Sequence, residues 1–177
     1  MEKFSLHYGI EKIPENANVI SRKAAKAVVM KDYKVLMILT NKGDYKFPGG
    51  GYKNQETVEQ CLSRELLEET GYLLQSIDRC VGMVSEENPD IYEEGSFFSM
   101  QSEYYWCTID DIHQQKQKLD DYEKEQDFTP VFVDVQKAVD NNKSLLSNNS
   151  KEINAWVRRE TDILIYLLNN IGNEDNE

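Results

Sequence analysis

Residues 50–72 read GGYKNQETVEQCLSRELLEETGY, and this stretch decides the fold of the chain. On a helical wheel its apolar residues and two of its acids recur at spacings of three and four, so they share one stripe. Glu68 lies on the border of that stripe. The residues of the stripe itself are Val58, Cys61, Leu62, Glu65 and Glu69.

Two carboxylates on the core-facing stripe of a helix are unfavourable without a partner. Like charges this close repel one another, and burying them unpaired costs several kcal/mol. A bound divalent cation removes both objections. A run such as Arg64 to Glu69 is, taken alone, more typical of a surface helix, because charge runs usually lie on solvated faces.

The flanking residues favour the metal-binding interpretation. Gly49, Gly50 and Gly51 follow Phe47-Pro48, and adjacent glycines let the backbone approach a ligand closely. Thr57 and Gln60 fit a capping box at the start of a helix, and Gly71 supplies a left-handed stop at its end. These signals predict a helix over residues 57–70, with the acids in its last two turns.

The spacing of these residues resembles the Nudix box. Gly50 is followed after five residues by Glu56, and after seven more by Arg64-Glu65-Leu66-x-Glu68-Glu69-x-Gly71-Tyr72. Every position of the signature is filled, although the family usually has an aliphatic residue where Tyr72 stands. A pattern with this many fixed positions is far more specific than a lone glycine motif. The resemblance extends over residues ~20 to ~140, about one domain length.

The resemblance implies a fold and a metal site. The fold is a Nudix-type α/β/α sandwich with a mixed β-sheet, here with an added C-terminal helix. Glu65, Glu68 and Glu69 would hold Mg²⁺, or Mn²⁺, with help from the carbonyl of Gly49. Four other residues would support the site structurally, Arg64 by pairing with Glu56. These four are Gly50, Glu56, Arg64 and Gly71.

The general base is less firmly assigned by the same resemblance. Nudix enzymes take it either from the box, here Glu65, or from an acid on a downstream loop. Glu123 is the favoured loop candidate, with Glu69 completing the predicted catalytic set, although a solvated loop acid explains Glu123 equally well. The alternatives are Glu125, Glu93 and Glu94.

Composition limits the partners of this chain. The net charge is −12, with 32 acids against 20 bases, which disfavours nucleic acid or an anionic membrane as a partner. The three cysteines lack the spacing of a zinc site or a disulfide framework, so we expect a reduced, cytoplasmic protein. No segment has the length of a membrane span. The resemblance to the Nudix family, rather than the composition, implies a small nucleotide-type substrate as the partner.

The chain divides into three parts by pattern. Residues 1–20 predict an N-terminal strand or arm that covers a sheet edge or joins a homodimer. Residues 21–145 form the Nudix domain, and residues 146–177 form a helix packed on it, with an acidic tail from Asn173. Glu160 interrupts the apolar stripe of that helix, which predicts a buried ion pair.

Within the domain, alternation and turn residues predict the individual elements. A hairpin turns at 31–33, an acidic loop spans 86–90, and residues 110–126 have no regular pattern. Asp134 caps a short helix, and the C-terminal helix starts at Lys151. The predicted strands are 24–30, 34–39, 77–84, 97–109 and 130–133.

Together these observations predict a Mg²⁺-dependent Nudix pyrophosphohydrolase. The leading substrate is a nucleoside diphosphate linked to another group, of the nucleotide sugar or ADP-ribose type. The alternatives are a nucleoside triphosphate pyrophosphatase and a Nudix module that binds a nucleotide without cleaving it. The sequence assigns no substrate-binding residues, because aromatics such as those between Phe97 and Trp106 more often belong to a core.

Overall fold

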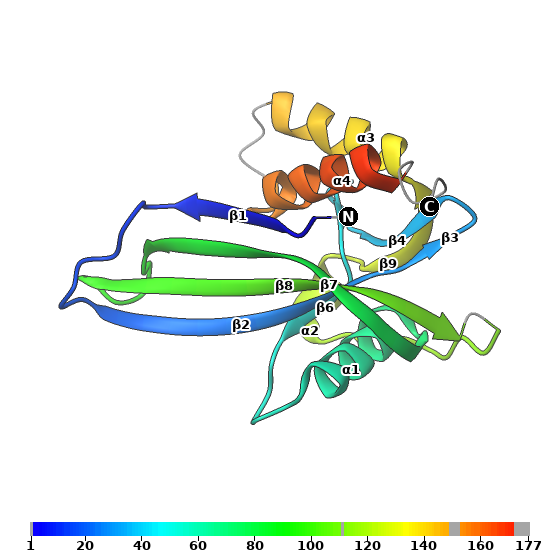
Figure 1. Ribbon diagram of the computed structural model, residues 1–177, viewed down its shortest axis with the longest axis horizontal. Coiled ribbons are helices and arrows are strands. Elements are labelled where there is room, and N and C mark those ends of the chain that lie inside the picture. Colours follow the sequence, from blue (N-terminus) through cyan, green and yellow to red (C-terminus); the bar gives the residue numbers. More distant parts are fainter. Residues whose placement is uncertain (1, 111, 149–152, 172–177) are drawn as a thin grey trace.

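A computed structural model describes residues 2–110, 112–148 and 153–171 of the 177-residue chain. A mixed β-sheet and a smaller antiparallel sheet lie between two layers of helices (Figure 1). Helices α3 and α4 cover one side, and α1 covers the other. The predicted α/β/α sandwich with a mixed sheet is therefore confirmed.

The first sheet has the strand order β1-β7-β8-β2-β6. Strands β1 and β7 are parallel, as are β8 and β2, whereas β7 with β8 and β2 with β6 are antiparallel. The strands are β1 (Phe4–Gly9), β2 (Asn18–Val28), β6 (Gly49–Gly51), β7 (Leu73–Pro89) and β8 (Ser96–Asp110).

The second sheet is built around β4, which pairs with all of its other strands. Its strands are β3 (Met30–Lys31), β4 (Lys34–Leu39), β5 (Tyr45–Lys46) and β9 (Thr129–Asp134). The helices are α1 (Val58–Thr70), α2 (Asp121–Glu125), α3 (Val135–Ser147) and α4 (Val157–Ile171). In the described part of the chain, no helix combines the length and the apolar character that crossing a membrane requires.

The predicted strand 24–30 is in fact two strands in different sheets. The chain leaves the first sheet after Val28 and enters the second at Met30. The hairpin turn is also shorter than the predicted 31–33, because Lys31 pairs with Lys34. Only Asp32 and Tyr33 form the turn, with φ of 49° and 61°, the positive values that a two-residue hairpin requires.

Strand β7 is much longer than the predicted 77–84, and it includes most of the predicted acidic loop. Glu86 pairs with Tyr8 of β1 on one side and with Met100 of β8 on the other. Pairing on both sides outweighs the weak strand propensity of this acidic run. Pro89 ends the strand, where its missing N–H is tolerated, and the turn follows it.

The N-terminal strand β1 lies at the edge of the first sheet, beside β7. Gly82 makes room for it, because a Cβ there would lie 2.4 Å from the ring of Phe4. Strand β2 begins at Asn18 and runs without a break through the proposed division between residues 20 and 21.

The C-terminal helix starts later than predicted. Asp134 caps α3 as expected, its carboxylate accepting from Lys137 N at 3.0 Å. Helix α4 begins only at Val157, and Asn154 and Trp156 precede it with side chains turned to the site described below. The predicted start at Lys151 and the predicted tail from Asn173 lie outside the described residues.

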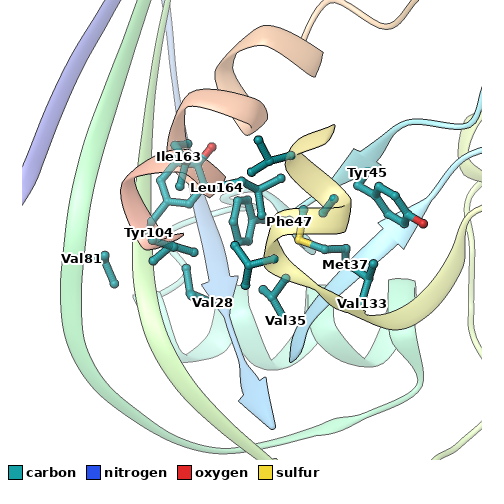
Figure 2. Packing of buried hydrophobic residues seen from close by; sticks show 14 of the residues in the cluster. Val28, Val35, Met37, Tyr45, Phe47, Val81, Tyr104, Val133, Ile163 and Leu164 are labelled. Carbon is teal, nitrogen blue, oxygen red and sulfur yellow. The ribbon is translucent and has the colours of Figure 1, made fainter. Parts of the chain in front are cut away.

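The core has two parts, one on each side of the sheets. The larger part joins the strands to α3 and α4, and Figure 2 shows Phe47 within it, beside Leu164 and Tyr104. The smaller part packs α1 against the strands through Leu62 and Leu66, both fully buried. Each such side chain stabilises the fold by about 1.5–3 kcal/mol. Phe47 packs against α4, and Gly49, two residues later, contacts Glu69 of α1. The segment that carries Phe47 thus lies between the two helical layers.

Candidate active site

Helix α1 presents its acids to the sheet because both of its ends are fixed as predicted. Thr57 Oγ1 accepts from Gln60 N at 3.2 Å, and Gln60 Oε1 accepts from Thr57 N at 2.9 Å. Gly71, with φ of 77°, donates its N–H to Leu67 O at 3.1 Å. The face buried between these caps includes both Glu65 and Glu69.

Glu69 is almost fully buried, with 2% of its surface exposed. One carboxylate oxygen accepts from Lys46 Nζ at 2.6 Å, and the other accepts from Gly49 N at 2.8 Å. Gly49 has φ of +129°, and a Cβ there would lie 2.2 Å from Ala25 O, so this position requires glycine. The backbone of β6 thereby presents the N–H of Gly49 to the carboxylate of Glu69.

Glu65 lies beside Glu69 and beneath Gly50. A Cβ on Gly50 would lie 2.6 Å from a carboxylate oxygen of Glu65, so the missing side chain makes room for the acid. Burial, and next the charge of Glu69, raise the pKa of Glu65, while the hydrogen bond from Arg64 lowers it. The fold holds these acids close to each other despite their repulsion.

Glu123 joins this pair from α2, a helix that the sequence pattern did not predict. The helix has a capping box, in which Glu123 N donates to Asp120 Oδ1 and Asp120 N donates to Glu123 Oε2, both at 2.8 Å. Burial raises the pKa of Glu123, against the lowering effect of the Asp120 N–H. The alternatives Glu125, Glu93 and Glu94 are exposed.

One carboxylate oxygen from each of Glu65, Glu69 and Glu123 lies within 4.8 Å of the others. We call these three residues the acid cluster. Oxygen donors at this spacing suit a hard divalent cation such as Mg²⁺ or Mn²⁺. The predicted catalytic set is therefore brought together in space.

Two of the predicted metal ligands make other contacts. Glu68 is outside the acid cluster and interacts with Arg64 at 3.3 Å and with Lys53 at 3.7 Å. The carbonyl of Gly49 accepts a hydrogen bond from Lys26 Nζ. Their roles as ligands stay predictions.

Arg64 connects α1 to strand β6. Its guanidinium donates to both carboxylate oxygens of Glu56, at 2.6 and 2.7 Å, and to Gly51 O at 3.0 Å. These bonds hold the pKa of Glu56 at about 2, well below its ordinary value. The expected pairing of Glu56 with Arg64 is thus present, and it supports the backbone of β6 above the acids.

Sequence reasoning missed two buried lysines of the site. Lys26 and Lys46 are 7% and 6% exposed, and both lie within the otherwise apolar segments 24–29 and 45–48. Burial, and next the charge of Lys46, lower the pKa of Lys26 to about 8. A lysine inside an apolar strand was the signal that could have identified them, because such lysines are rarely fully buried without a partner.

Two pockets meet at the acid cluster. The first, which we call the aromatic pocket, has a volume of about 350 Å³ and includes Tyr122, Phe128 and Trp156. The second, which we call the basic pocket after the three cationic side chains that line it, has a volume of about 420 Å³ and also includes five acids, Glu65, Glu68, Glu69, Asp120 and Glu123. The three cations are Arg22, Lys53 and Lys118. The residues shared by both pockets are Gly50, Gly51, Glu69 and Glu123.

A larger hollow of about 600 Å³ lies elsewhere, between the β3–β4 turn and the strands β7 and β8. It contains Tyr33, Arg79 and Trp106 but no residue of the acid cluster. Size alone therefore does not identify the active site here. The convergence of three acids is the observation that marks the acid cluster as the candidate active site.

A family model described as the NUDIX domain matches residues 20–160. A comparison with curated proteins gave no match. Among solved structures, a MutT NUDIX hydrolase from Burkholderia pseudomallei is 17% identical with a TM-score of 0.51, over 81% of this chain and 97% of that chain.

Two further solved structures are more distant in shape. An ADP-ribose pyrophosphatase from Streptococcus suis is 14% identical with a TM-score of 0.46, over 75% of this chain and 96% of that one. A UDP-X diphosphatase is 16% identical with a TM-score of 0.43, over 59% of this chain. The match spans only 50% of that diphosphatase. At such identities the structural likeness concerns the fold.

Proposed function

This chain belongs to the NUDIX family, and from that premise we propose that it is a Mg²⁺-dependent pyrophosphohydrolase. Its substrate is a nucleoside diphosphate linked to a second group, and the bond cleaved is the phosphoanhydride. The observation that carries the proposal is the acid cluster at the junction of two pockets. A substrate with a different group on each side of a diphosphate fits that arrangement.

The residues of the cluster fit a divalent cation. Glu65 and Glu69 are buried and would hold the ion, while Glu123, whose carboxylate lies within 4.8 Å of theirs, would act as the base rather than as a ligand. Lys46 pairs with Glu69 by direct contact, while burial, and next the charge of Glu69, raise the pKa of Glu65. Mg²⁺, or Mn²⁺ in its place, would neutralise the diphosphate and activate a water for in-line attack on phosphorus.

The chain itself supplies proton transfer and positioning. Glu123 is the preferred general base, because its carboxylate is fixed by the Asp120 N–H and its pKa is raised toward the range where a base is effective. Glu65 remains the second candidate. Lys26 and Lys46 line the aromatic pocket next to Glu69 and place positive charge where a phosphate would lie.

The pocket pair favours a two-ended substrate over a nucleoside triphosphate. The basic pocket is large enough for a further group of the substrate, since small-molecule sites are about 300–1,000 Å³, and it presents Arg22, Lys53 and Lys118. A binding module without activity would not need its full set of acids, and this chain retains all of them.

The test is a hydrolysis panel in H₂¹⁸O. ADP-ribose, nucleotide sugars, dinucleotides and nucleoside triphosphates are incubated separately with the protein and Mg²⁺ or Mn²⁺. We expect scission inside a phosphoanhydride, with ¹⁸O on a phosphate product and the fastest turnover for a two-ended substrate. Label on a sugar carbon would overturn the mechanism, and fastest turnover of triphosphates would overturn the substrate class. Binding with no hydrolysis of any compound would identify a non-catalytic module.

A further inference from the structure

We propose that the aromatic pocket binds the nucleoside end of the substrate, with the base stacked on Trp156 and a hydrogen bond from the nucleoside to Ser102. The basic pocket then receives the group on the other side of the diphosphate. This assignment rests on the proposed function, because it takes the acid cluster as the place of the diphosphate. It identifies substrate-binding residues, which the sequence left unassigned.

The ring of Trp156 is held rigidly. Its Nε1 donates to Asp44 Oδ2 at 2.8 Å. Asp44 is fully buried and its other oxygen accepts from Thr40 Oγ1 at 2.7 Å and from Asn154 Nδ2 at 2.9 Å. A ring fixed in this way loses little freedom when a ligand stacks on it, which favours binding.

Tyr122 and Phe128 extend this ring into a wall. Tyr122 meets Trp156 and Phe128 edge to face, each with ring centroids 6.4 Å apart. The phenol oxygen of Tyr122 accepts from Gln126 Nε2 at 2.6 Å, so its position is also fixed. Because Tyr122 precedes Glu123 in α2, the wall is joined directly to the acid cluster.

Strand β8 provides the floor of the pocket. Phe98, Met100 and Ser102 alternate along it, so their side chains share one face of the sheet. Ser102 is 1% exposed, and its Oγ has no hydrogen-bond partner among the described residues. A buried hydroxyl without a partner is costly, and a polar atom of a bound nucleoside would supply the missing bond.

The charges fix the direction in which the nucleotide lies. Lys46 Nζ is 2.6 Å from Glu69 and 4.4 Å from the ring centroid of Phe128, so positive charge stands between the acid cluster and the aromatic wall. A nucleotide matches this arrangement, because its charged phosphate lies at one end and its uncharged base at the other, with the ribose between them. Both pockets are lined by three cations, but the basic pocket has a single aromatic side chain, Tyr52, and no wall of packed rings, so it suits the base less well.

Tryptophan fluorescence can test this assignment directly. The sequence contains two tryptophans, and Trp106 lies in the separate hollow. The Trp106→Phe variant leaves Trp156 as the single reporter. AMP, UMP and ribose 5-phosphate are titrated into it with Mg²⁺, and none of these probes contains a phosphoanhydride. We expect saturable quenching by at least one nucleotide and none by ribose 5-phosphate.

Kinetics of the best two-ended substrate provide the second readout. Because stacking and the hydroxyl bond are remote from the reacting phosphorus, we expect KM to rise about tenfold in Trp156→Ala and about fivefold in Ser102→Ala, with kcat within threefold. Tyr92→Ala is the matched control, since Tyr92 is 91% exposed on the β7–β8 turn and should change neither constant. Ser102→Ala keeps the test decisive if Trp156→Ala fails to fold, because this hydroxyl has no described protein partner to lose.

The outcomes separate this inference from the proposed function. Quenching by a nucleotide without hydrolysis of any substrate would support the pocket assignment and refute the activity. Hydrolysis with no quenching, and with unchanged KM in both variants, would refute the pocket assignment and leave the activity intact. Equal quenching by ribose 5-phosphate would show that the sugar, rather than the base, occupies the wall, and would overturn the proposal.

Discussion

Two buried glutamates, on opposite sides of the molecule, accept hydrogen bonds from the backbone of the same short segment, residues 47–49. Glu160 of α4 accepts from Phe47 N at 2.9 Å, and Glu69 of α1 accepts from Gly49 N at 2.8 Å. Their exposed fractions are 0% and 2%. The two acids thus have nearly the same burial and the same kind of backbone partner, yet we assign them different roles.

The difference lies in their remaining neighbours. The second oxygen of Glu160 accepts from Arg159 at 2.7 Å and from the Tyr104 hydroxyl at 3.2 Å, which satisfies it within the protein. Both oxygens of Glu69 also have partners, Lys46 and Gly49 N, but two further acids lie within 4.8 Å of it and it lines two pockets. A buried acid that is paired with a cation and stands outside a cluster of acids stabilises the fold, whereas one grouped with other acids at a pocket is suited to bind a further cation.

The largest expected effect comes from removing the charge of Glu69. In Glu69→Gln we expect kcat to fall by about 10³-fold or more, because a ligand of the metal and its charge are lost together. The amide can still accept from Gly49 N, but the buried Lys46 loses its charged partner, so we expect a less stable protein that still folds. Steady-state kinetics on the best substrate measure the first effect, and near-ultraviolet circular dichroism measures the second. Activity equal to that of the unmodified protein would refute the role of Glu69.

The matching change in α4 should affect stability rather than catalysis. Glu160→Gln removes the charge that faces the buried Arg159, which we expect to lower the free energy of unfolding by about 3 kcal/mol. Glu86 also contacts Arg159 and limits the loss. Urea titration provides the measurement. A fall in kcat beyond threefold for the folded variant would show that the two glutamates are not separable in this way.

Within the acid cluster, Glu123 is distinguished from Glu65 and Glu69 by its proposed role as general base. If it is the general base, Glu123→Gln should lower kcat about 30- to 100-fold, within the usual range for acid–base catalysis. Glu125→Gln, two residues away and exposed, is the matched control and should retain full activity. Equal activity of the two variants would transfer the role of base to Glu65.

The smallest effect concerns the structural pair that supports the site. Because Arg64 lowers the pKa of Glu56 from 4.5 to about 2, the folded state holds the charged form, and the pair stabilises the protein above the ordinary pKa. That stabilisation is lost as the pH falls from ~4.5 toward ~2. Glu56→Gln should therefore cost about 2 kcal/mol at pH 7 and progressively less in acid. A cost that does not change with pH would contradict this origin.

The part of the structure that was predictable from sequence depends on local signals. Thr57 and Gly71 fix the ends of α1 through neighbouring residues, and the helical period then places Glu65 and Glu69 on the inner face. Asp134 likewise marks the start of α3. Glu160 was predictable in the same way. It interrupts the apolar stripe of its helix, which predicts a buried ion pair, and Arg159 is the partner that the structure shows.

The rest depends on contacts between distant segments. Strand β7 extends to Pro89 only because β1 and β8 pair with it, and no local pattern encodes that. Lys46 acquires its role from Glu69, 23 residues away, and Trp156 from Asp44, 112 residues away. The sequence could therefore predict the acids of the cluster but not the lysine and the aromatic side chains that lie beside them.

The central claim is that the two buried glutamates differ in their ability to bind a metal ion. The most direct test is to measure the affinity of each variant for Mn²⁺ by isothermal titration calorimetry, at a temperature below the melting temperature of every variant. The account predicts that Glu65→Gln and Glu69→Gln each weaken Mn²⁺ binding at least about tenfold, since each removes one charged oxygen ligand. It predicts that Glu160→Gln binds Mn²⁺ as tightly as the unmodified protein. Unchanged binding in Glu69→Gln, or equal weakening in Glu160→Gln, would contradict it.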